Sequence, residues 1–202
     1  MSHFEFLRRE WPSVHESAAK AESAALADPR TACFYARRAL ELAVQWVFKH
    51  DTALRMPYQD NISALLHEPS FKQAAGEAVF TKAKLVVKLG NNAAHNNSAI
   101  SGSDSVASVR ELFHVLFWMA RTYARGERPH AATVFEPSAL PRTTVPVQTL
   151  AQIQTLQEAL EAKDRELSMA QSDKTARDQE LSRLRDVVAK AKMAAAAIRD
   201  DH

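Results

Sequence analysis

Glycine and cysteine are scarce in this chain, and their scarcity narrows both its fold and its chemistry. Only four glycines occur among 202 residues. Since glycine costs about 1 kcal/mol relative to alanine inside a helix, this composition favours helices. The single cysteine, Cys33, excludes an internal disulfide and a cysteine-rich metal site. It lies among apolar neighbours in an expected helix, which predicts a buried, unreactive thiol. One cysteine also fits a reducing compartment, so we expect a cytoplasmic protein.

Other signals that would assign a function class are also missing. No apolar run approaches the roughly 20 residues that a membrane-spanning helix needs, and residues 1–13 lack the pattern of a signal peptide. We therefore expect no membrane partner. No GxxxxGK[ST] phosphate-binding loop occurs, and the eight histidines have no zinc spacing. The sequence thus predicts no metal site and no cofactor in this chain. A net charge of +2 is too small to indicate nucleic-acid binding by itself.

What the chain does have is helical periodicity. An apolar cluster that includes Phe4 and Trp11 opens it, and apolar stripes then recur with the spacing of a helix. Asp28 and Pro29 have the residue types of a helix start, Ser103 or Asp104 could cap a later helix, and Gly126 could end it. No stretch alternates with period two, so we expect no sheet. Helices are predicted at residues 13–27, 29–49, 62–66, 77–89 and 106–125.

Beyond residue 126 the character of the chain changes twice. Four prolines in residues 127–147 exclude a helix and predict a linker, with Val134 and Phe135 forming a strap that lies on the bundle. Residues 148–202 contain no glycine or proline and carry an apolar heptad seam. A helix this long needs a partner helix, and a homodimer is one option, although Lys163, Lys174 and Arg177 would weaken a parallel homodimer at the seam. The seam consists of Ile153, Leu156, Leu160, Leu167, Leu181, Leu184, Val188 and Ile198.

Residues 81–97 form the one place where polar residues interrupt a helical apolar pattern. We expect a helix to end at Gly90, Asn91 or Asn92 to cap the next segment, and His95 to lie on its first turn near Lys88. His95 could then act as a general base on a ribose hydroxyl, with Lys88 and the two amides at a phosphate. Alternatively, His95 is buried and its ring nitrogen satisfies a backbone carbonyl. The spacing alone favours the structural interpretation.

The segment KLGNNAAHNN resembles the motif of the HEPN superfamily, in which histidine follows an arginine by four to six residues. This resemblance implies a metal-independent ribonuclease site, usually formed across a dimer. The chain departs from the motif, because Gly90, Leu89 and Lys88 occupy the positions where the arginine is expected. Lysine lacks the planar two-point grip of a guanidinium on phosphate.

A second resemblance covers nearly the whole chain. The blocks FLRREWPSVHESAAKAE, YARRALELAVQWVF, MPYQDNISALLHEP, KLGNNAAH and VRELFHVLFWMARTYA are together similar to the N-terminal helical domain of type I restriction endonuclease R (HsdR) subunits. In that family the domain precedes a coiled coil, a nuclease domain and a motor. The resemblance implies a fragment of an ATP-dependent deoxyribonuclease that needs Mg²⁺, with DNA and the other restriction-modification subunits as partners. The expected fold is all-α, with a HEPN-like bundle at 4–126, a linker at 127–147 and a coiled-coil arm at 148–202.

Three functional hypotheses follow. The first is a non-catalytic interaction module of the R subunit that contacts other subunits or nucleic acid. The second is a divergent HEPN ribonuclease that uses His95, Lys88, Asn91 and Asn92. The third is a stand-alone helical protein that binds nucleic acid through a basic face, which would consist of Arg8, Arg9, Arg37 and Arg38.

Overall fold

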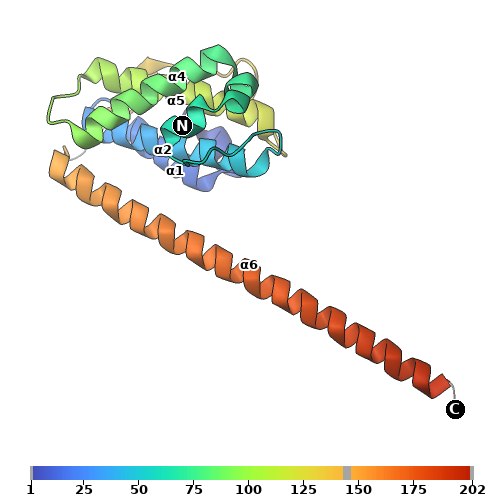
Figure 1. Cartoon of the computed structure of the whole chain (residues 1–202). Helices are drawn as coiled ribbons and strands as arrows, with labels where there is room; N and C mark the ends of the chain where they lie inside the picture. Colours follow the sequence, from blue (N-terminus) through green and yellow to red (C-terminus); the bar gives the residue numbers. More distant parts are fainter. Residues whose placement is uncertain (1, 143–146, 201–202) are drawn as a thin grey trace. The chain divides into compact units, whose positions relative to one another are not determined.

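The computed structural model describes residues 2–142 and 147–200, and the side chains up to residue 190. Every regular element in these residues is helical, which confirms the all-α prediction (Figure 1). The chain divides into two compact units, Met1–Gln154 and Thr155–His202. We call them the bundle unit and the C-terminal unit. The division falls within the last helix, seven residues beyond the expected end of the linker; positions 143–146 of that linker lie outside the described residues.

Four long helices build the bundle unit. Their starts follow the local signals in the sequence: Asp28 Oδ1 accepts a hydrogen bond from Thr31 N at 3.2 Å, which caps the second helix. The cap of the helix that begins at Gly102 is Ser101, which accepts from Asp104 N at 3.0 Å, and neither Ser103 nor Asp104. The helices are α1 (Pro12–Ala24), α2 (Pro29–His50), α3 (Ile62–His67), α4 (Pro69–His95), α5 (Gly102–Tyr123) and α6 (Leu150–Asp200), with 3₁₀ turns η1 (Glu5–Leu7) and η2 (Pro137–Ala139).

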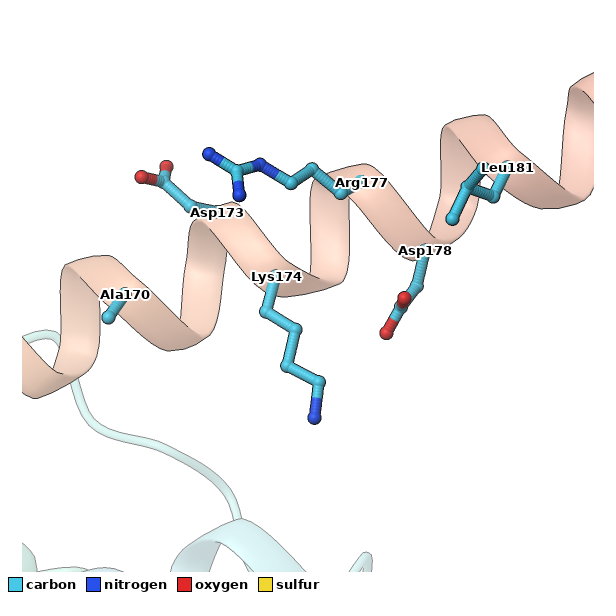
Figure 2. Close-up of a pocket in the computed structure, with 6 residues that line it drawn as sticks. All are labelled: Ala170, Asp173, Lys174, Arg177, Asp178 and Leu181. Atoms are coloured by element: carbon cyan, nitrogen blue, oxygen red, sulfur yellow. The ribbon is translucent and has the colours of Figure 1, made fainter.

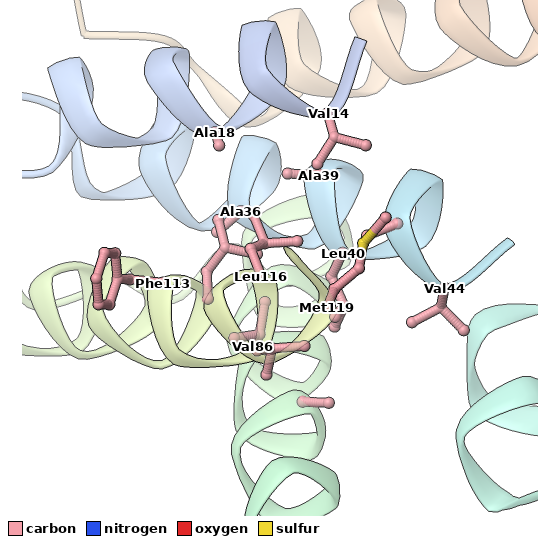
Figure 3. Packing of buried hydrophobic residues seen from close by; sticks show 14 of the residues in the cluster. Val14, Ala18, Ala36, Ala39, Leu40, Val44, Val86, Phe113, Leu116 and Met119 are labelled. Carbon is pink, nitrogen blue, oxygen red and sulfur yellow. The ribbon is translucent and has the colours of Figure 1, made fainter. Parts of the chain in front are cut away.

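Helix α2 lies at the centre of the bundle unit, and ten of its residues are buried. It packs against α1, α4 and α5. Leu40 of α2 lies near Leu116 and Met119 of α5, and Ala39 faces α1 (Figure 3). Each of these large side chains is fully buried, and such burial stabilises a fold by about 1.5–3 kcal/mol per side chain. The apolar residues of the helix predicted at 29–49 therefore contribute to the core.

Helix α4 contains one real break. Gly76 has φ 76° and ψ 162°, a left-handed conformation that glycine adopts without a steric penalty. The short turn that starts at Pro69 and the longer helix that follows meet there. The break lies directly before residue 77, where the sequence predicts a helix to begin.

The predicted strap does lie on the bundle. The Phe135 ring is 4.7 Å from the His3 ring, and Glu136 N donates to His3 Nε2 at 3.1 Å. His3 Nδ1 is in turn 2.5 Å from Glu22 Oε1 of α1. Val134, by contrast, is exposed. The strap is thereby joined to both the N-terminal segment and α1.

The end of the strap is held at the start of α2. Gln148 N donates to Asp28 Oδ2 at 2.8 Å, so the carboxylate that caps α2 also binds the strap. Gln154 Nε2 donates to the carbonyl oxygen of Ala94 at 3.3 Å. Ile153, predicted as the first seam residue, is fully buried in the bundle unit and is therefore not available to a partner helix. That part of the seam prediction is wrong.

Over the residues described, no helix combines the length and apolar content that crossing a bilayer requires.

Candidate functional site

Gly90 does not end a helix, contrary to the expectation from sequence. Helix α4 continues through it to His95. Gly90 is buried where α4 crosses α2, and a Cβ at this position would lie only 2.3 Å from Arg37 Cβ. The glycine therefore serves the close approach of two helices, a role that the sequence of α4 alone does not reveal.

The polar residues after Gly90 consequently have other roles than predicted. Asn91 and Asn92 lie inside the helix and cap nothing, and the carbonyl oxygen of Asn92 accepts from Asn96 N at 3.1 Å. His95 is the last residue of α4, and its side chain is exposed. The structural interpretation, in which a buried His95 holds the helix junction together, is wrong.

Three of the four predicted catalytic candidates do share one site. Lys88, Asn91 and Asn92 line a groove of about 320 Å³ between α3 and α4, which we call the α3–α4 groove. His95 is not among its lining residues and follows Lys88 by seven positions, about 10 Å along the helix axis. The histidine in the groove is His67. The remaining lining residues are Ser63, Leu66, Lys84 and Val87.

His67 is held in a defined orientation. Its Nδ1 lies 2.8 Å from the carbonyl oxygen of Ser63, one turn earlier in α3. Because a carbonyl oxygen only accepts, Nδ1 carries the proton and Nε2 is the nitrogen left for a ligand. The ring also makes a T-shaped contact with Phe80 of α4, with centroids 5.2 Å apart. The ring is therefore fixed by both helices that form the groove.

The α3–α4 groove is electropositive because Lys84 and Lys88 line it and no acidic residue does. Two carboxylates, one directly after His67 and one on α5 against α4, have other partners. Glu68 accepts from the Ser70 hydroxyl and from Ser70 N, and these hydrogen bonds lower its pKa. Glu111 of α5 pairs with Lys82 at 2.7 Å. Burial raises the pKa of Glu111, but its hydrogen bonds with Lys82 and Arg110 outweigh burial, so the net shift is downward.

The four predicted nucleic-acid-binding arginines do not form one face. Arg8 and Arg9 line a second cavity, of about 830 Å³, together with Arg125, Arg128 and His130. Arg8 is paired there with Glu5, Nε to Oε1 at 2.7 Å. The other two arginines are on α2, outside this lining. Arg37 packs on Gly90 and donates to Glu41 Oε1 at 2.8 Å, so it has a structural role.

Comparison with known proteins gives one match. A family model described as "Domain of unknown function (DUF4145)" matches residues 19–168. The chain belongs to this family. No curated protein and no solved structure matches the chain. The matched residues include both helices of the α3–α4 groove and the first part of α6.

The C-terminal unit exposes most of the predicted seam. Four apolar seam side chains on α6 are each more than half exposed: Leu167 59%, Leu181 52%, Leu184 52% and Val188 51%. Leu156 and Leu160 are partly exposed, and the side chain of Ile198 lies outside the described residues. The middle of the seam is charged: Lys174 and Arg177 project from α6 together with Asp173 and Asp178 (Figure 2).

Taken together, the described residues offer two kinds of binding chemistry. The α3–α4 groove presents ammonium and amide donors that suit an anion. The exposed seam of α6 presents apolar area that suits another helix. No three histidine, cysteine or acidic side chains within residues 2–142 and 147–190 meet in an arrangement that could hold a metal ion.

Proposed function

We propose that this DUF4145 protein is a non-catalytic interaction module of a type I restriction endonuclease R subunit. It would support DNA restriction by contacting other subunits or nucleic acid. The exposed apolar seam on α6 carries the proposal. The resemblance of five sequence blocks to the N-terminal helical domain of R subunits supplies the assignment to restriction. ATP and Mg²⁺ would serve the motor and the nuclease of the parent protein.

The seam supports an assembly role on energetic grounds. Complete burial of Leu167, Leu181, Leu184 and Val188 by a partner would contribute about 1.5–3 kcal/mol for each side chain. Association costs at least about 4 kcal/mol in lost freedom of motion. Burial of these four side chains alone therefore gives modest affinity. A stable complex forms when they are part of a larger interface.

The charged middle of the seam restricts the choice of partner. In a parallel, in-register dimer, Lys174 would face Lys174 and Arg177 would face Arg177, and like charges oppose such pairing. A partner helix with carboxylates at these positions avoids that cost. We therefore favour a different subunit as the partner, or a second copy in antiparallel orientation. Both are coiled-coil arrangements.

A matched pair of variants tests this proposal. Leu181→Lys adds a charge on the seam, and Met169→Lys adds the same charge at a residue of α6 that is 65% exposed and lies off the seam. Sedimentation velocity is run on each full chain alone and mixed with the specificity and methylation subunits of a type I system. We expect the wild type and Met169→Lys to form the larger species and Leu181→Lys to lose it. A wild-type chain that remains monomeric and binds neither subunit refutes the proposal.

A further inference from the structure

We infer that the α3–α4 groove binds single-stranded nucleic acid, with one backbone phosphate held by Lys84, Lys88 and the side-chain amides of Asn91 and Asn92. This inference rests on the proposed contact with nucleic acid and adds the site and the class of strand. It does not depend on the seam of α6, because the groove belongs to the bundle unit.

The donors of the groove converge on one stripe of α4. Lys84, Lys88 and Asn91 are spaced by four and three residues, which places them on one face of the helix, and all three are exposed. The rise between the two lysines is about 6 Å, so both ammonium groups can reach one phosphate. Asn92 Oδ1 already accepts from Asn96 Nδ2 at 3.0 Å, which leaves the N–H groups of Asn92 as its contribution to a ligand.

The lysines are available for an intermolecular anion. Within the described residues neither Lys84 nor Lys88 forms an ion pair, whereas Lys82 on the adjacent face is paired with Glu111 at 2.7 Å. Lys84 Nζ lies 5.3 Å from the centre of the Phe80 ring, a contact that orients the side chain without neutralising its charge. A phosphate entering the groove would thus meet two charges that have no competing carboxylate.

The floor of the groove favours a nucleotide over a phosphate ion. Leu66 and Val87, which are 1% and 8% exposed, line the groove and add a small apolar area to it. Inorganic phosphate has no group that would contact this surface, whereas an unpaired base or a sugar does. The fixed ring of His67 adds an aromatic face beside it. Sites for single-stranded nucleic acid typically combine cationic and hydrogen-bonding groups for the phosphates with apolar and aromatic faces for the bases. In a single strand the bases are unstacked and accessible. A duplex keeps its bases stacked inside.

The first test removes the two charges. Lys84→Gln/Lys88→Gln is compared with Lys49→Gln/Lys190→Gln, which changes the net charge equally at exposed positions outside the groove and off the seam. Fluorescence anisotropy of the full-length chain uses labelled oligothymidylate and oligouridylate of about 12 nucleotides. For single strands, log K changes with log[salt] with a slope near −0.7 for each phosphate contact. Loss of this one phosphate contact therefore reduces the slope by about 0.7 and weakens binding about 5-fold at 0.1 M salt.

A second pair of variants changes one atom of a side chain. Asn91→Asp replaces an amide donor with a carboxylate in the groove, and Asn97→Asp does so in the exposed segment after α4. We expect Asn91→Asp alone to weaken strand binding by about tenfold or more, since it removes a donor and repels the phosphate. Far-UV circular dichroism confirms that both variants remain folded.

Several outcomes would overturn the inference. These are equal affinity for the groove and control variants, tighter binding of a duplex of the same sequence, and complete displacement of the strand by inorganic phosphate at equal phosphate concentration. Absence of strand binding at low salt would overturn it as well. In each case sedimentation of the same samples shows separately whether the seam of α6 still mediates assembly, so that failure of the groove and failure of the proposed function are distinguished.

Discussion

The crossing of α2 and α4 at Gly90 gives the sharpest prediction about the bundle unit. We expect Gly90→Ala to destabilise the fold, although alanine is the better helix former. The added Cβ would lie 2.3 Å from Arg37 Cβ and 2.8 Å from Arg37 Cδ. The nearer atom is attached directly to the backbone of α2, so no rotation of the Arg37 side chain can relieve the contact. The two helices must move apart.

The magnitude follows from two opposing effects. Replacing a helical glycine with alanine gains about 1 kcal/mol from backbone entropy and solvation. Overpacking a tight contact costs about 1–3 kcal/mol, and a contact between two Cβ atoms at this distance belongs at the upper end. The net loss in the free energy of unfolding is therefore about 2 kcal/mol. For a unit of this size, such a loss lowers the melting temperature by about 4–8 °C.

Thermal melting followed by circular dichroism measures this shift, with Gly102→Ala as the control. Gly102 is the first residue of α5, and an added Cβ there meets nothing within 4 Å. The melting temperature of the Gly102→Ala variant should therefore equal or exceed that of the wild type. Combining Gly90→Ala with Arg37→Gly, which removes the opposing Cβ, should recover part of the loss as a favourable coupling energy. If Gly90→Ala is as stable as the wild type, the close-approach role of Gly90 is refuted.

Three further predictions concern single side chains. Asp28→Ala should lower stability by about 2 kcal/mol, because it removes the cap of α2 and the acceptor of Gln148 N; an unchanged melting temperature would contradict this. Cys33 is buried, and burial raises its pKa to about 12, so a maleimide at pH 7 should label it only after unfolding; labelling of the native chain would contradict its burial. Glu10 accepts hydrogen bonds from the backbone amides of Arg125 and Gly126, and these bonds lower its pKa. The ionised carboxylate therefore stabilises the fold at pH values above the unfolded pKa near 4.3, and this contribution is lost as the pH falls through the folded pKa. The difference in melting temperature between wild type and Glu10→Gln should thus shrink from pH 7 to pH 3, and a constant difference would argue against the ionised carboxylate.

The helices of the bundle could be predicted because their signals are local. The apolar stripe of α2 and its Asp28–Pro29 start depend only on neighbours in sequence. Gly90 could not be interpreted in this way. A glycine at the end of an apolar run is compatible with a helix end and with a close helix crossing, and the choice depends on Arg37, which lies 53 positions earlier.

The candidate site shows the same limit. The spacing of Lys84, Lys88 and Asn91 on one face of a helix can be read from sequence once the helix is known to continue beyond Gly90. The participation of His67 could not be read, since it depends on how α3 packs against α4. The sequence pattern points to His95 because it follows Asn91 and Asn92 by about one helical turn. In the fold it is an exposed residue at a helix end.

The strap has a consequence for the order in which the chain folds during synthesis. Helical bundles fold quickly because most of their contacts are local, yet Gln148 binds Asp28 across 120 positions and Glu136 binds His3 across 133. At about 5–20 residues per second, 120 residues take about 6–24 s to synthesise. Until then the carboxylate that starts α2 lacks the backbone amide of Gln148 as a donor. The bundle therefore cannot be completed until Glu136 and Gln148 have been synthesised.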